Sequence, residues 1–418
     1  MRLTTILNST LKFKGFVFKK CKFIEKQTDP PQLEIEVLSR KGSQGRCSKC
    51  NRKCPGYDHL SRRRFAHIPI WGFLVFFVYS PRRVSCPTCG VRVELLPWAI
   101  GKCRMTKSYC WYLSDWAGRL SWTEVAQCFR TTWYHVYKAI EMAVEWGRSR
   151  LDLDNITSIG IDEIQWHSGK RYLTLVYQID IHCKRLLWIG ENRSMKTLTE
   201  FFKWFGEERS LKLEFVCSDL WQAYLKVVKK KASQAFHVLD RYHIMALIGK
   251  AIDKVRAQEV KKLKEKGKKP ILKRTRWIFL KRPENLTVSE DQKLAQLVKQ
   301  NLKTVRCYLL RESFQRFWEY VSAYWAGRFI DRWTRKVMYS RIEPLKKVAR
   351  TIRQHKPIIL NYFKANKKIN QGVVEGMNNK VKLNIRKAYG FRTKKAAEVQ
   401  LYHALGKLPK PTFTHRFF

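Results

Sequence analysis

Three acidic residues are placed where they could do chemistry together. Asp162 follows the β-branched run Ile159-Gly160-Ile161, Asp219 follows Phe215-Val216-Cys217-Ser218, and Glu375 lies far downstream. A carboxylate that ends a buried strand is unfavourable unless it meets a cation, and Mg²⁺ is held well by two or three carboxylates because it keeps several waters. Two such ions could activate a water or a 3′-hydroxyl and stabilise the leaving oxygen of a phosphodiester. The spacing alone leaves a second reading open, in which the aspartates cap loops and Glu375 pairs with a lysine.

A further acid and a histidine follow a predicted strand over residues 235–239. Asp240 and His243 are three residues apart in Asp-Arg-Tyr-His, so both can face the same rim from the start of a helix. Either could orient a metal-bound water or contact the scissile phosphate. The alternative is a helix cap beside a buried core histidine.

Two Cys-x-x-Cys pairs predict a structural metal site. Each pair can present two thiolates to a tetrahedral Zn²⁺, and four protein ligands leave no open position for catalysis. The four predicted ligands are Cys47, Cys50, Cys86 and Cys89. Gly90 suits the tight turn after the second pair. Four reduced core thiols are the alternative, and Cys54, His59 and His67 lie near enough in sequence to substitute for a ligand.

Residues 107–147 are predicted to be helical. Ser121-Trp-Thr-Glu124 fits a capping box for a helix over 123–129, and Thr131 or Thr132 can cap a helix over 133–146. Two helices joined by a short turn are the outline of a helix-turn-helix, whose second helix contacts bases near its start. The predicted DNA-contacting residues there are Tyr134, His135 and Lys138. A helical hairpin that only links two domains is the alternative.

The composition favours a polyanionic partner. Lys and Arg number 84 against 34 Asp and Glu, so the formal net charge is +50. Such a charge opposes compaction unless it is met by a partner such as nucleic acid. A 45% hydrophobic content and 15 Trp argue against disorder. The longest apolar run, 68–79, is about half of the ~20 residues that a membrane span needs, and we see no signal segment, so we expect a soluble, cytoplasmic, nucleoid-associated protein.

The order of predicted elements outlines a ribonuclease H-like α/β core. Three strands (158–164, 172–179 and 185–189) precede a helix (198–207), a strand (214–217), a helix (221–230) and a strand (235–239). A basic helical region follows, Pro357 interrupts it, and a last helix is expected over about 373–387. We expect a strand-rich segment of open role (1–45), a zinc ribbon (46–104), a helix-turn-helix domain (105–150), a first core part (151–250), a helical basic insertion (251–356) and a C-terminal core part (357–418).

Four motifs resemble the DDE transposases of the ISL-three family of bacterial insertion sequences. They are Gly160-Ile-Asp162-Glu163, Ser218-Asp219-Leu-Trp-Gln-Ala-Tyr224, Asp240-Arg-Tyr-His243, and Val374-Glu375-Gly-Met-Asn-Asn-Lys380-Val-Lys382 through Arg386-Lys-Ala-Tyr-Gly390-Phe-Arg392. The last motif is long and specific, and the cysteine pairs and helix-turn-helix also occupy the positions that the family gives them. Residues 1–45 match no motif of the family.

The resemblance implies a metal-binding triad of Asp162, Asp219 and Glu375 in a ribonuclease H-like core with a helical insertion. Asp240 and His243 look like the Asp-x-x-His signature found after the second acid in several DDE groups. The helix after Glu375 offers Lys380, Lys382 and Arg386 to the DNA backbone.

We therefore expect a DNA transposase that uses two Mg²⁺ ions (or Mn²⁺) and a structural Zn²⁺. It would bind terminal inverted repeats, cleave the transposon ends and join their 3′-hydroxyls to target DNA. Cutting two ends suggests at least a dimer on double-stranded DNA. Two alternatives stay open: a non-catalytic DNA-binding protein, such as a repressor or domesticated remnant, and a nuclease of the same fold that cuts without joining.

Overall fold

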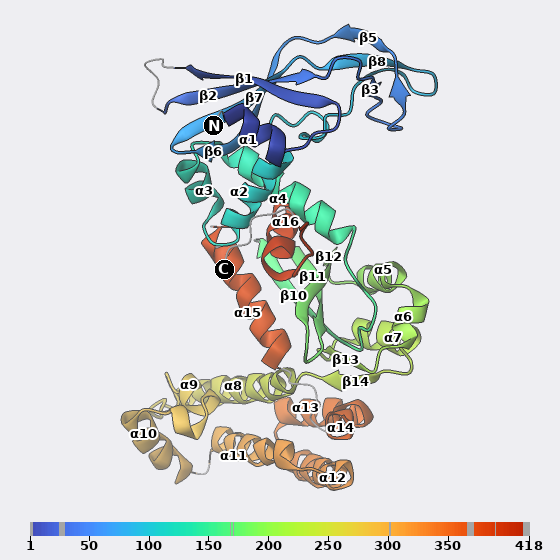
Figure 1. The fold of residues 1–418 in the computed structure, drawn as a ribbon. Helices are drawn as coiled ribbons and strands as arrows, with labels where there is room; N and C mark the ends of the chain where they lie inside the picture. Colours follow the sequence, from blue (N-terminus) through green and yellow to red (C-terminus); the bar gives the residue numbers. More distant parts are fainter. Residues whose placement is uncertain are drawn as a thin grey trace. The chain divides into compact units, whose positions relative to one another are not determined.

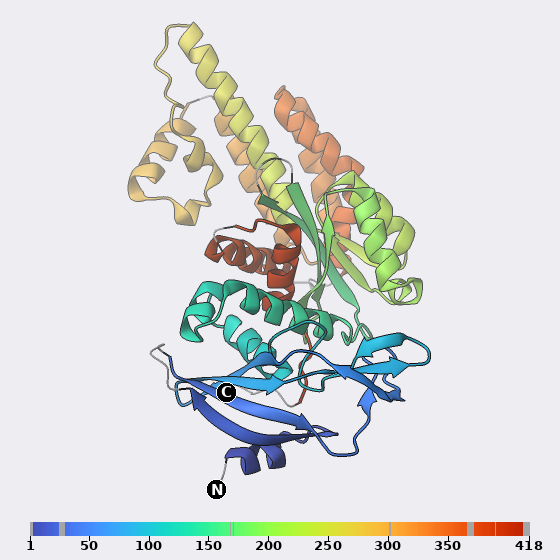
Figure 2. The same ribbon diagram turned by 90° about the horizontal axis from the view of Figure 1, so that it is seen from above.

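The computed structural model describes residues 3–24, 30–167, 169, 171–300, 302–365, 372–388 and 390–412. The chain forms two compact units, which are described separately (Figure 1, Figure 2). Unit 1 comprises Met1–Asp152 and Asn384–Phe418, and unit 2 comprises Leu153–Leu383. Among the described residues, no helix is both long enough and apolar enough to cross a membrane.

Unit 1 begins with a β-rich region. Its main sheet has the order β1-β2-β7-β6, and smaller sheets pair β3 with β4 and join β5, β8 and β9. The elements are α1 (Leu3–Thr10), β1 (Phe16–Ile24), β2 (Gln32–Ser39), β3 (Gly45–Arg46), β4 (Lys53–Cys54), β5 (Gly56–His59), β6 (Arg63–Ile70), β7 (Phe73–Tyr79), β8 (Arg82–Cys86) and β9 (Gly90–Val93). Aromatic rings fill the core, with Trp98 in edge contact with Phe16, Phe65 and Tyr79. The strands expected in residues 1–45 are confirmed as β1 and β2, whereas α1 was not predicted.

The remainder of unit 1 is helical. Its helices are α2 (Lys107–Ala117), α3 (Trp122–Cys128), α4 (Trp133–Arg148) and α16 (Lys394–Leu405). The capping box of Ser121 and Glu124 is present, and the side chain of Thr132, rather than Thr131, caps α4. The expectation that the helix before Gly390 is the last one was wrong, because α16 follows it, capped by Thr393 and packed on α4.

Unit 2 is built on a five-stranded sheet with the order β12-β11-β10-β13-β14. Strands β10, β11 and β12 are antiparallel neighbours, whereas β13 and β14 run parallel to β10. The elements are β10 (Ser158–His167), β11 (Arg171–Ile179), β12 (Lys184–Glu191), α5 (Met195–Phe205), α6 (Glu207–Leu211), β13 (Phe215–Ser218), α7 (Gln222–Lys231) and β14 (Phe236–Leu239). All five predicted strands and the helices predicted over 198–207 and 221–230 are therefore confirmed within a few residues.

Helices α5 and α7 cover one face of this sheet. Phe201 and Phe205 of α5 and Tyr224 of α7 share one hydrophobic cluster with Ile159 and Ile161 of β10. Because side chains alternate along a strand, Gly160 and Asp162 face the opposite side. That side is where the candidate site lies.

A helical region lies between β14 and the last helix of unit 2. It consists of α8 (Arg241–Glu265), α9 (Arg276–Leu280), η1 (Pro283–Asn285), α10 (Val288–Val298), α11 (Lys303–Gln315), η2 (Arg316–Glu319), α12 (Ala323–Tyr339), α13 (Glu343–Gln354) and α14 (Lys356–Lys364). Buried Phe314, Trp318 and Trp333 give it a hydrophobic core, whereas Tyr324 and Trp325 are exposed. The predicted interruption at Pro357 is confirmed as the break between α13 and α14, and Pro357 itself lies in the first turn of α14, since proline fits the first turn of a helix. Helix α15 (Gly372–Lys387) then returns to the sheet.

Candidate active site

Three neighbouring strands carry carboxylates at the same level. The parallel register pairs Gly160 with Cys217, so Asp162 and Asp219 each lie two residues beyond a paired position. Ser218 pairs with Leu239 in the next strand, so Asp240 lies level with Asp219. Asp162 does not end its strand as predicted, because β10 continues to His167 against β11. It is the parallel pairing to β13 that stops at Gly160, and this opens the edge beside Asp162.

Helix α15 is packed onto the carboxylate face of β10 through Gly160. A Cβ built on Gly160 would lie 2.5 Å from Cγ2 of Val374, so only glycine allows this approach. Val374 precedes Glu375, which is exposed on the first turn of α15. The close approach of the helix is therefore what holds Glu375 at this face of the sheet.

Replacing Gly160 by alanine is expected to displace α15 and to destabilise unit 2 by about 1–3 kcal/mol, as overpacking does. The double variant Gly160→Ala/Val374→Ala removes the clashing methyl groups and should recover part of the loss. Gly376→Ala on the same helix meets nothing within 4 Å and should instead stabilise by about 0.5–1 kcal/mol through helix propensity. Thermal unfolding measures the stability of all three variants. Equal losses of stability in Gly160→Ala and Gly376→Ala would show that the contact between Gly160 and Val374 does not limit the packing of α15.

A hydrogen-bond chain ties α15 to Asp162. The side-chain amide of Asn378 donates to Oδ2 of Asp162. The Tyr177 hydroxyl of β11 donates to Oδ1 of Asn378 at 2.6 Å, and the backbone N–H of Glu163 donates to the other carboxylate oxygen of Asp162 at 2.7 Å. Asn378 is buried one turn after Glu375, so this chain fixes the helix and the first aspartate to each other.

Arg193 bridges two acids of the site from the loop after β12. Its Nη2 donates to Oδ2 of Asp219 at 2.9 Å, and its Nε lies 2.8 Å from Oε1 of Glu163. The guanidinium also lies 4.5 Å from the ring centre of Trp221. The backbone N–H of Trp221 donates to Oδ1 of Asp219 at 2.9 Å. Asp219 is therefore held in one orientation by a cation and a backbone amide.

The acids of the site repel one another. Burial raises the pKa of Asp162, and the carboxylates of Asp219 and Asp240 raise it further, against the opposing effects of the Glu163 N–H and His243. Burial likewise raises the pKa of Asp240, helped by Glu375 and opposed by the Tyr242 N–H and His243. Burial and Asp219 together raise the pKa of Glu163 to about 8, although Arg193 opposes them. Clustered carboxylates of this kind favour a bound cation, because its charge relieves both the burial penalty and the repulsion.

The predicted residues of this site thus come together, and others join them. Asp162, Asp219 and Asp240 lie level on the sheet, Glu375 acts on Asp240 from α15, and Nε2 of His243 is 3.8 Å from Oδ2 of Asp240. Arg193, Asn378 and Tyr177 were not predicted to act at this site. Asn378 stands in the motif around Glu375, which is the signal that could have drawn attention to it, whereas no local pattern points to Arg193.

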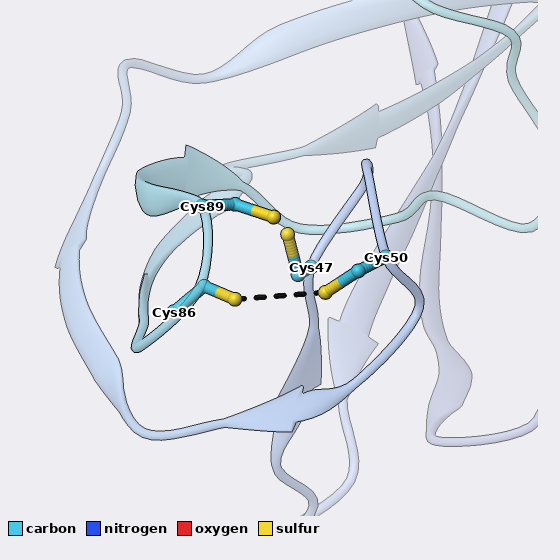
Figure 3. A group of neighbouring side chains, drawn as sticks. All are labelled: Cys47, Cys50, Cys86 and Cys89. Carbon is cyan, nitrogen blue, oxygen red and sulfur yellow. Dashed lines mark hydrogen bonds between the residues drawn. The ribbon is translucent and has the colours of Figure 1, made fainter.

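The four predicted zinc ligands form a separate cluster in unit 1 (Figure 3). Their sulfurs all lie within 4.8 Å of one another, and Sγ of Cys50 is 3.5 Å from Sγ of Cys86. Two sulfurs bound tetrahedrally at Zn–S distances of ~2.3 Å lie ~3.8 Å apart, so the spacing fits that ion. In the described part of the chain, this is the only group of metal-ligating side chains so closely gathered.

The backbone favours the thiolate form at two of the cysteines. N–H groups of Thr88 and Cys89 lower the pKa of Cys86 to about 6, and those of Cys50 and Lys49 lower the pKa of Cys47, whereas burial and the neighbouring thiols raise the pKa of Cys89. The nearby residues that could have substituted are used otherwise. Cys54 donates to the carbonyl of Arg52, His67 stacks on Phe77 and bonds to Thr106, and His59 is exposed.

The predicted DNA-contacting residues lie on two helices. At the start of α4, Tyr134 is 59% exposed, His135 is half-buried beside the Thr131 hydroxyl, and Lys138 pairs with Glu141 at 2.7 Å. On α15, the predicted phosphate contacts are Lys380, Lys382 and Arg386, all of which are exposed. The three residues on α15 are therefore at the surface, whereas on α4 Tyr134 is more exposed than His135 or Lys138.

Comparison with known proteins identifies the relatives of this chain. A protein-family model described as a transposase, of the DDE type and the ISL-three group, matches residues 159–400, more than half of the 418-residue chain. A second model, described as the zinc-finger of transposase IS204/IS1001/IS1096/IS1165, matches residues 43–89, which contain all four clustered cysteines.

Two curated relatives agree with these matches. The chain is 28% identical over 349 residues to the transposase for insertion sequence element IS1001 of Bordetella parapertussis, covering 83% of this chain and 85% of the relative. It is 29% identical over 392 residues to the transposase for insertion sequence element IS1557 of Mycobacterium tuberculosis, covering 88% and 87%. The similarity therefore extends over most of both chains.

Proposed function

The chain belongs to the DDE transposases of the ISL-three family of insertion sequences, and from that membership we propose how it acts. It binds the terminal inverted repeats of its element, cleaves the transposon ends and joins the freed 3′-hydroxyls to target DNA. The observation that carries this proposal is the register that sets Asp162, Asp219 and Asp240 level on three neighbouring strands. Glu375, on α15, which packs on Gly160, lies close enough to Asp240 to raise the pKa of that carboxyl group.

Asp162, Asp219 and Glu375 would hold two Mg²⁺ ions. The donor set fits, because it consists of carboxylates whose mutual repulsion a divalent cation would relieve. When bound, such ions supply activation of the attacking oxygen and stabilisation of the leaving oxygen. Asn378 and the Glu163 N–H hold Asp162 in place, while Arg193 and the Trp221 N–H hold Asp219.

Asp240 and His243 would complete the site without being the main ligands. The Asp240 side chain accepts from the Tyr242 N–H at 2.8 Å and so caps α8. His243 lies on the first turn of that helix, beside Asp240. From there its imidazole would contact the scissile phosphate or hold the attacking water, with Asp240 orienting the ring.

The remaining assignments complete the proposal. The five-stranded sheet with α5, α7 and α15 would be a ribonuclease H-like core, with the helices between Asp240 and Lys364 as its insertion. Helices α3 and α4 would form a helix-turn-helix beside the zinc ribbon, with Tyr134, His135 and Lys138 nearest the bases. At least two chains would act together, because a transposon has two ends to cut.

Removing Lys382 and Arg386 together is expected to flatten the salt dependence of DNA binding. Each lost phosphate contact lowers the slope of log affinity against log salt by about 0.9, so the Lys382→Ala/Arg386→Ala protein should lose about 1.8 of the slope. Fluorescence anisotropy with a labelled duplex at several salt concentrations measures it. Lys229→Ala/Lys230→Ala removes the same charge from the exposed end of α7 and should leave the slope unchanged. If both variants changed the slope equally, α15 would make no specific contact with the DNA backbone.

The decisive experiment uses DNA that carries the two ends flanking this gene. The purified chain is incubated with that DNA, a target plasmid and Mg²⁺, and the products are separated on a denaturing gel. Strand breaks at the ends together with joined products support the proposal. Hydrolysed ends without joined products would favour a nuclease, and DNA bound but never cut would favour a non-catalytic binding protein.

A further inference from the structure

Unit 1 contains a cavity of about 420 Å³ beside the start of α4. One wall is a single face of that helix, with Tyr134, Lys138, Glu141 and Glu145 spaced by three or four residues. The other wall is the segment Ile100–Lys107, which leads from the β-rich region into α2. The volume lies in the range of about 300–1,000 Å³ typical of sites for small ligands.

The second wall supplies three cations without acidic partners. Among the described residues, no carboxylate lies within ion-pair distance of Lys102, Arg104 or Lys107. Lys107 is half-buried, and burial lowers its pKa, so its charge is partly desolvated and no carboxylate in the described ranges balances it. Such unbalanced cations at a concave surface favour an anionic ligand.

The first wall supplies little free negative charge. The carboxylate of Glu141 is already engaged by Lys138 and Lys395, and Glu145, the other acid of that wall, also interacts with the charge of Lys395. Met105 and Met142 give the cavity an apolar lining, and the 59% exposed ring of Tyr134 stands at its edge. An aromatic ring over an apolar pocket suits the flat face of a base.

We propose that this cavity binds one nucleotide, with its phosphate on Lys102, Arg104 and Lys107 and its base against Tyr134. Two ligands carry both a phosphate and a base: a nucleotide unstacked from DNA that is bound at α4, and a free nucleoside phosphate. The first source rests on the proposed function, since α4 would be the helix that contacts the transposon ends. The second does not.

Cys103 gives a residue-specific readout of occupancy. It lines the cavity and is half-buried, and interaction with the Cys110 thiol lowers the pKa of Cys103. A lowered pKa makes a thiol easier to alkylate at neutral pH. A ligand in the cavity should therefore slow the reaction of Cys103 with iodoacetamide, followed by mass spectrometry on the zinc-loaded full chain, and half-buried Cys183 of unit 2 serves as the internal reference.

We expect ATP at ten times its dissociation constant, and separately a duplex carrying the flanking ends, to slow Cys103 labelling about tenfold without changing Cys183. Lys102→Ala/Arg104→Ala/Lys107→Ala should abolish this protection. The matched control Lys19→Ala/Lys20→Ala/Lys22→Ala removes the same charge from β1 of the same unit and should retain it.

The outcomes separate the site from the function. Protection by ATP alone assigns the site to a free nucleotide. If the duplex protects Cys103 in the unchanged chain, and the cavity triple variant still binds the duplex but is no longer protected, the site is assigned to DNA. The proposed site is overturned if the duplex still protects Cys103 in the triple variant, or if neither probe protects Cys103. This holds even if the chain cleaves the transposon ends. If ATP protects Cys103 but the chain neither binds nor cuts the transposon ends, the proposed nucleotide site is supported and the transposase proposal is refuted.

Discussion

Asp219→Asn is expected to lower the rates of end cleavage and strand joining by about 100-fold to 1,000-fold, as losing a key electrostatic group does at other active sites. The substitution removes a negative charge from the level where Asp162, Asp219 and Asp240 meet. It preserves the size of the side chain and the oxygen that accepts from the Trp221 N–H. Gel assays of cleavage and joining in Mg²⁺ measure the loss, and fluorescence anisotropy should find the affinity for end DNA within about twofold of the unchanged chain, because backbone cations dominate it.

Asp180→Asn is the matched control for that loss. Asp180 is also a buried acid that directly follows a strand, β11, but its oxygens accept from Thr157 and Gln178. Its replacement should change stability by about 1 kcal/mol and leave cleavage intact. Equal activity losses in the two variants would mean that Asp219 acts through folding, and full activity of Asp219→Asn would remove it from the metal site.

Cys86→Ser is expected to release zinc and unfold the ribbon. Zinc binding contributes about 10–16 kcal/mol to the folding of small zinc domains, which exceeds the whole stability of about 5–15 kcal/mol of an ordinary domain. The β3–β4 and β5–β8–β9 sheets around the cysteines are small, so little else can replace the metal. Atomic absorption measures the zinc content, and circular dichroism measures the lost strand signal, which a chelator should reproduce in the unchanged chain.

Cys54→Ala tests whether the effect belongs to the metal or to any buried thiol. Cys54 is buried in the same small core and its sulfur interacts with the Cys86 thiol, but it donates to the Arg52 carbonyl and does not belong to the group of four sulfurs that lie within 4.8 Å of one another. This variant should keep its zinc. Zinc loss from Cys54→Ala, or an unchanged circular dichroism spectrum in Cys86→Ser and after chelation, would contradict the four-cysteine assignment.

Features that depend on neighbouring residues were predictable. The five strands of the core sheet, the capping box of Ser121 and Glu124 and the four-cysteine cluster were all found where the sequence placed them. Each of these depends on periodicity, on a cap three residues away or on a short cysteine spacing. The two family models that match the chain confirm the family that the sequence motifs indicated.

Predictions failed where distant packing decides the outcome. Helix α16 was missed although Thr393 caps it, because its burial comes from α4, more than 200 residues earlier. Asp162 was taken as a strand end, but β11 extends β10 past it.

The sequence by itself determined the chemistry that this protein can offer: acids that suit Mg²⁺, thiols that suit Zn²⁺ and a charge that suits DNA. These follow from residue type and local spacing. Only the tertiary structure decided how the acids meet, through the strand register, the absence of a Cβ at Gly160 and the side chains of Asn378 and Arg193. Asn378 contacts a partner 216 residues away and Arg193 one 26 residues away. No local pattern encodes such pairs, because the energy that selects them comes from packing elements together after each has formed.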